Sequence, residues 1–128
     1  MTSPAVLDWD GSDDAGEINA PTWAEVDERL RALNGYDRTI LTLTRGDAHL
    51  AVGGDAASGL VLYVDLGGED FRNLIGPRTD KCLVEIVAGG QPGNYQSRQV
   101  VSVEQALAAA RVFWEAGKLD PAQTWETH

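Results

Sequence analysis

The sequence predicts an α+β fold in the order α-β-β-β-β-β-α, with a mainly antiparallel five-stranded sheet and both helices packed on one face of it. Two observations predict this arrangement. An amphipathic segment that opens with a capping box lies towards each end of the chain, and the residues between them form β-type stretches separated by glycine-containing turns. Short turns between successive strands favour antiparallel pairing. The length of 128 residues suits a single domain.

The first helix is predicted over residues 22–34. Thr22 and Glu25 have the spacing of a capping box, in which each side chain accepts a hydrogen bond from the backbone N–H of the other residue. Asn34-Gly35 supplies the left-handed conformation that commonly ends a helix. One face of the segment is apolar and consists of Trp23, Val26, Leu30 and Leu33.

Five segments between the helices have the composition of strands. They are rich in β-branched residues, and turn-forming sequences such as Gly46-Asp47 and the GGQPGN of residues 89–94 separate them. Residues 66–80 contain several Gly and Pro residues and are predicted to be mostly irregular. The predicted strands are Arg38–Thr44, Ala48–Val52, Leu60–Asp65, Lys81–Ala88 and Tyr95–Val101.

The second helix is predicted to begin after Ser102, which forms a capping box with Gln105, and to end at Gly117. Its apolar stripe consists of Val103, Ala106, Leu107, Ala110, Phe113 and Trp114. Trp23 and Trp114 are therefore predicted to pack in the core, and Trp125 is predicted to fold back over it.

Acidic residues are concentrated at the start of the chain. The net charge is −10, from 20 acidic and 10 basic residues, and residues 1–28 hold eight acidic residues and no Lys or Arg. Residues 1–21 are predicted to be an acidic flexible segment, irregular over Asp8–Ala20, and residues 22–128 a single α+β domain. The acidic residues of residues 1–28 are Asp8, Asp10, Asp13, Asp14, Glu17, Glu25, Asp27 and Glu28.

This charge bears on the partner. Nucleic acid is a poor partner because phosphate binding requires clustered Lys and Arg, whereas a cationic protein would be attracted. Simple solubility explains the acidity equally well. Trp9, inside the acidic segment, is predicted to lie outside the regular core and to contact a partner, because interfaces use aromatic residues ringed by charge. The candidate partner-binding residues are Asp8, Trp9, Asp10, Asp13, Asp14 and Glu17.

The sequence does not support catalysis, a metal site or a cofactor. A nucleophilic Cys82 would require His49 or His128 as its base, but Cys82 lies in a predicted strand, where a buried structural thiol is expected. His49 beside a turn is expected to be solvated or capped. One cysteine cannot form an internal disulfide, and no apolar run is long enough for a membrane helix. We therefore expect a cytoplasmic, non-enzymatic binding domain with no membrane partner and an oligomeric state that the sequence leaves open.

Packing and turn motifs mark the chain from about Trp23 to Trp125, and none of them is catalytic. They are the opening helix, the hairpin Ile40–Val52 running into Gly53-Gly54, the turn Pro92-Gly93-Asn94, the helix Val103–Phe113, Gly117, Pro121 and Trp125-Glu126. In these motifs the chain resembles the Imm1 family of immunity proteins from bacterial polymorphic toxin systems.

The resemblance implies a small α+β protein encoded beside a toxin, frequently a nucleic-acid deaminase, that binds the toxin and prevents self-intoxication. An acidic inhibitor would then compete with nucleic acid for a basic toxin cleft. Two other classes stay open. One is a structural or regulatory subunit that docks on an unrelated protein. The other is an enzyme, which would require a cleft joining Cys82, His49 and an acid.

Overall fold

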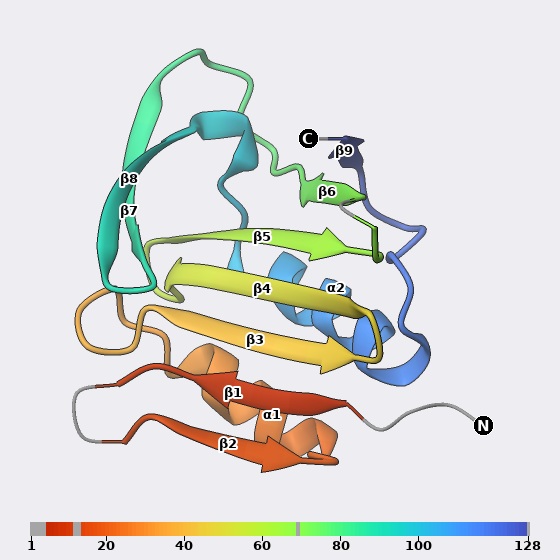
Figure 1. Ribbon diagram of the computed structural model, residues 1–128. Coiled ribbons are helices and arrows are strands. Elements are labelled where there is room, and N and C mark those ends of the chain that lie inside the picture. Colours follow the sequence, from red (N-terminus) through yellow and green to blue (C-terminus); the bar gives the residue numbers. More distant parts are fainter. Residues whose placement is uncertain (1–4, 12–13, 69, 128) are drawn as a thin grey trace.

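The structure is a computed structural model that describes residues 5–11, 14–68 and 70–127. Figure 1 shows a large twisted sheet with both helices behind one of its faces and a separate two-stranded hairpin at one end. The α+β class, the antiparallel pairing and the placement of both helices on one face are as predicted. The strand number and element order are not.

The sheet has seven strands in the order β2-β1-β3-β4-β5-β6-β9, and every neighbouring pair is antiparallel. The first three predicted strands are confirmed as β3, β4 and β5. The strands are β1 (Val6–Trp9), β2 (Gly16–Asn19), β3 (Ile40–Arg45), β4 (Ala48–Asp55), β5 (Gly59–Asp65), β6 (Phe71–Leu74) and β9 (Trp125–Thr127).

Strands β1 and β2 correct the prediction of an irregular Asp8–Ala20 segment. β1 lies between β2 and β3, and its Leu7 side chain is fully buried. Val6 and Asp8 alternate with Leu7 and Trp9, so the acidic residue points away from the core while its neighbours pack into it. The acidic composition suggested an irregular segment. The charges occupy only one of the two faces of the strand, however, and the other face can pack into the core.

The last two predicted strands do not join the sheet as strands, and only Val101 forms an isolated antiparallel bridge, to Leu60 of β5. β7 (Leu83–Ala88) pairs with β8 (Gln91–Gln96) in a separate hairpin, and a 3-10 turn, η1 (Ser97–Gln99), follows β8. Gly89 and Gly90 both have positive φ, 63° and 78°, as a tight two-residue hairpin turn requires. The second strand therefore starts at Gln91, four residues earlier than predicted, and Pro92 is tolerated because β8 has one unpaired edge.

Both helices begin where their capping boxes predict. α1 (Trp23–Arg31) follows Thr22, and α2 (Val103–Ala116) follows Ser102 and ends at Gly117 in the left-handed conformation. α1 ends three residues before the predicted Asn34. The reason is that the Asn34 side-chain oxygen instead accepts backbone hydrogen bonds from the next loop, at Tyr36, Asp37 and Arg38.

The core lies between the helices and one face of the sheet. Alternate residues of β3, β4 and β5 point into it, against Val26 and Leu30 of α1 and Phe113 of α2, all of them fully buried. The inward strand residues are Leu41, Leu43, Leu50, Val52, Leu60, Leu62 and Val64. The intervening residues of the same strands necessarily form the opposite face of the sheet, which no helix covers.

Candidate functional site

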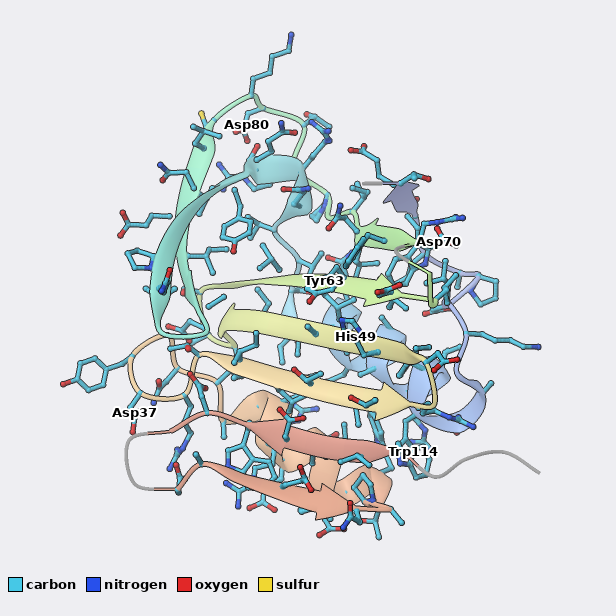
Figure 2. The ribbon with its side chains drawn as sticks, viewed as in Figure 1. Asp37, His49, Tyr63, Asp70, Asp80 and Trp114 are labelled. Atoms are coloured by element: carbon cyan, nitrogen blue, oxygen red, sulfur yellow. The ribbon has the colours of Figure 1, made fainter. Side chains whose placement is uncertain are left out.

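The sheet face opposite the helices is the main surface that the fold leaves uncovered, and we call it the open face. The strand register aligns its residues in rows across the sheet, two of which cross six strands, and a shorter third row holds Ile40, Gly53 and Val61. In Figure 2 the labelled His49 and Tyr63 lie on this face, in front of the strands. One of the two long rows consists of Glu17, Asp8, Thr42, Ala51, Tyr63 and Asn73, and the other of Asn19, Val6, Thr44, His49, Asp65 and Phe71.

A hollow of about 500 Å³ lies where the β7–β8 hairpin meets the open face. The Tyr63 and Phe71 rings, whose centroids are 5.7 Å apart, stand at one side of it. Burial raises the pKa of the Tyr63 hydroxyl, and Asp65 and Tyr95 raise it further. The lining is mostly apolar and consists of Ile40, Ala51, Gly53, Val61, Leu62, Tyr63, Phe71, Asn73, Ala88, Tyr95 and Gln99.

Close packing fixes the hairpin against the sheet. A Cβ atom on Gly53 would lie only 2.5 Å from the Cβ of Ala88, so only glycine at this position permits the approach. The backbone N–H of Gly90 donates a 2.8 Å hydrogen bond to the Thr39 hydroxyl. At the other end of the hairpin, the buried Ser97 hydroxyl donates to the Asp80 carbonyl at 2.6 Å. The hairpin is therefore a fixed wall of the hollow.

Asp8 and Glu17 bring two negative charges side by side on the open face. They are directly opposed in the β1–β2 pairing, and no salt bridge to either is present among the described residues. The pKa of Asp8 is raised, first by burial and then by the charge of Glu17. Uncompensated like charges of this kind are costly for the free protein and favourable for a cationic partner.

The arginines, in contrast, are mostly neutralised within the chain. Arg45 points to the helix side and donates to the carbonyls of Phe113 and Trp114, at 3.3 and 2.9 Å. The other arginines of the described chain each form a salt bridge, so the unpaired charge is predominantly negative. They are Arg29, Arg31, Arg38, Arg72, Arg78, Arg98 and Arg111.

Asp10 and Asp14 are engaged by the chain itself. The Asp10 carboxylate accepts hydrogen bonds from the backbone N–H groups of Thr39 and Ile40, at 2.6 and 2.9 Å, and from the Thr39 hydroxyl. Asp14 forms a 2.7 Å salt bridge with Arg38 and a longer one with Arg29. These two acids tie the β1–β2 hairpin to β3 and α1, whereas Asp8 and Glu17 face outwards. Asp13 lies outside the described residues.

The prediction that Trp9 lies outside the regular core is wrong. Its ring is partly buried against the core, and the Arg29 guanidinium lies 4.1 Å from the ring centroid. Its indole N–H donates a 2.6 Å hydrogen bond to the carbonyl of Asp14. Gly16, opposite Trp9 in β2, leaves room for the ring, because a Cβ atom there would lie 2.8 Å from it. Trp9 points to the helix side because it lies two residues after Leu7 on the same strand, and alternate side chains of a strand point to the same face.

Trp9→Ala is accordingly expected to destabilise the domain by about 1–3 kcal/mol, less than for a fully buried tryptophan. Urea denaturation followed by circular dichroism measures the change. Trp9→Phe is the matched control, since it keeps an aromatic ring near Arg29 and removes the indole hydrogen bond and one of the two fused rings, and it should cost less. If Trp9→Ala unfolded at the same urea concentration as the wild type, Trp9 would not contribute to the core and would be a surface residue.

The other three tryptophans lie as predicted, packed against the core. The rings of Trp23 and Trp114 have centroids 5.9 Å apart, and the Trp114 indole N–H donates to the carbonyl of Pro21 at 2.9 Å. Trp125 opens β9 and donates to the Asp120 carbonyl at 2.9 Å.

The prediction of a buried Cys82 is wrong. Cys82 is exposed and precedes β7, at a part of the hairpin that extends beyond the sheet. His49, expected to be solvated or capped beside a turn, is partly buried, with its Nε2 atom 3.4 Å from the Tyr63 hydroxyl oxygen. Figure 2 shows Asp80, which accepts from the Cys82 backbone N–H, well away from His49. The structure therefore does not join Cys82, His49 and an acid in one cleft; His128 lies outside the described residues.

Two further kinds of site are absent from the part of the chain that the structure describes. No group of three or more His, Cys, Asp or Glu side chains in this part of the chain could hold a metal ion. Among the described helices, none is long and apolar enough to cross a membrane.

The open-face residues outside β1 and β2 were missed by the sequence analysis. The signal was present in the alternation of LVLYVD at 60–65, which puts Tyr63 and Asp65 opposite the three apolar residues Leu60, Leu62 and Val64. The sequence did not show that the β7–β8 hairpin would rise beside them.

The paired acids give a testable effect on stability. Because the folded-state pKa of Asp8 is raised, its charged form disfavours folding at pH values above that pKa, and this contribution fades as the pH falls through it. Glu17→Gln removes the neighbouring charge and should raise the melting temperature at neutral pH, with the gain vanishing in acid. Glu104→Gln, an exposed acid on α2, is the control. A melting temperature that Glu17→Gln leaves unchanged or lowers contradicts the repulsion.

No curated protein matches the chain. A family model described as "Immunity protein Imm1" matches residues 14–127, which is most of the chain.

Proposed function

Since the chain belongs to the Imm1 family of immunity proteins, we propose that it neutralises its cognate bacterial toxin by presenting an acidic surface to a basic cleft of that toxin. We further propose that this toxin acts on nucleic acid and belongs to the deaminases. The family match over residues 14–127 is the observation that carries this proposal. Inhibition is by binding, with no catalytic step and no cofactor.

The charge distribution supports the acidic mechanism. An enzyme that acts on nucleic acid must attract phosphates and therefore presents Lys and Arg around its active site. The net charge of −10, with Asp8 and Glu17 unpaired on the open face, complements such a surface. Electrostatic complementarity mainly speeds association and excludes wrong partners. We propose that the chain binds the toxin in the cytoplasm of the producing cell, because the toxin would attack that cell's nucleic acid there.

The test is to purify this chain together with the toxin domain encoded beside it and to titrate the toxin's activity with increasing amounts of the chain. Tight neutralisation predicts a stoichiometric complex and activity that falls in proportion to the added chain until one equivalent is reached. The absence of any complex would remove the immunity proposal. The alternative, a structural or regulatory subunit of an unrelated assembly, predicts instead a stable complex with a protein that is not a toxin.

A further inference from the structure

The hollow on the open face has the size and lining of a pocket for a side chain of a partner. Its lining includes Ala51, Gly53 and Val61 of the sheet, the rings of Tyr63 and Phe71, and Ala88 and Tyr95 of the hairpin. The small residues Ala51 and Gly53 leave space that the chain's own side chains do not fill. Apolar pockets with aromatic edges, rimmed by polar groups, are where interface anchors bind most strongly.

The charges in the two rows that reach the hollow are acidic. Asp8 and Glu17 lie in the same row as Ala51 and Tyr63, and Asp65 lies in the adjacent row beside Phe71. None of the open-face positions in the two rows holds a Lys or Arg. Arg72, on the neighbouring strand β6, is paired with Asp70 at 2.9 Å. An occupant must therefore combine an apolar side chain with positive charge.

We propose that the hollow receives an apolar side chain from a basic loop of the toxin, and that Lys or Arg residues flanking that side chain pair with Asp8, Glu17 and Asp65. This proposal rests on the immunity function and specifies the surface that performs it. A second copy of this chain is a poorer occupant, because two open faces would bring their unpaired carboxylates together. A cationic loop instead relieves the repulsion between Asp8 and Glu17, which lie directly opposite each other in the β1–β2 pairing.

Two substitutions test the hollow, with binding to the toxin domain measured by calorimetry. Val61→Arg places bulk and positive charge in the hollow, and Ala51→Leu adds bulk alone. Each should weaken binding, with Val61→Arg weakening it about 30-fold or more, the loss typical of a blocked interface anchor. Ala108→Arg and Ala108→Leu are the matched controls, since Ala108 is exposed on α2 behind the sheet, and they should change the affinity by less than about twofold.

Methyl resonances of the wild-type protein give a readout that does not depend on how the variants fold. On adding toxin, the methyl signals of Ala51, Val61 and Ala88 should shift while that of Ala108 stays in place. If the methyl signals of the hollow did not shift in a complex that neutralises the toxin, the inference would be wrong and the immunity function would still hold. Failure of the wild-type chain to bind the toxin would overturn both. Concentration-dependent shifts of the same methyls without toxin would identify a second copy as the occupant and also overturn it.

Discussion

Replacing Leu7 by alanine is expected to lower the free energy of unfolding by about 2–5 kcal/mol, the usual cost of truncating a fully buried leucine. Leu7 is fully buried on β1, a strand with neighbours on both sides in the sheet. The removed methyl groups would leave a cavity in the hydrophobic core, and the surrounding side chains can only partly collapse into it. Chemical denaturation at equilibrium measures the effect.

Val6→Ala provides the matched control for that experiment. Val6 is the neighbouring residue on the same strand, but it points to the open face and is only partly buried. Its replacement should cost clearly less than that of Leu7. If both variants unfolded at the wild-type midpoint, the N-terminal segment would be the flexible acidic extension that its composition suggested, and β1 would not belong to the stable sheet.

The second large effect is expected on the rate of toxin binding. The double variant Asp8→Asn/Glu17→Gln should associate about tenfold more slowly than wild type at low salt, because the two unpaired carboxylates contribute to the attractive field. Raising the salt concentration should slow the wild type and narrow the difference, since mobile ions screen charges beyond a Debye length of about 10 Å at 0.1 M. Stopped-flow association kinetics over a salt series measures both.

Glu28→Gln/Glu104→Gln removes the same amount of charge from exposed positions on the two helices. It should slow association much less, because those helices lie behind the sheet. Equal effects from the two double variants would mean that overall charge, and not the open face, guides the encounter. If the association rate did not depend on salt concentration, electrostatic attraction would not guide the encounter with the toxin.

The sequence by itself determined the parts of this fold that depend on short-range interactions. Both helix starts follow from side chains three residues apart, Thr22 with Glu25 and Ser102 with Gln105. The strands β3, β4 and β5 follow from alternation over a few residues and from the turns between them. The acidic balance, and the family resemblance that the family match later confirmed, were also visible in the sequence.

Only the tertiary structure decided what depends on distant partners. β1 is a strand because β3 pairs with it and the core receives Leu7, and β6 and β9 pair across about 50 residues of chain. Whether Lys81–Val101 joined the sheet or stood beside it was likewise a matter of packing, decided where Ala88 meets Gly53. The same strand pairings also decide what each acidic side chain contacts. Asp8 and Glu17 point outwards, whereas Asp10 and Asp14 bind groups of their own chain. Local composition carries no information on such contacts, because it does not specify which distant segment will lie opposite.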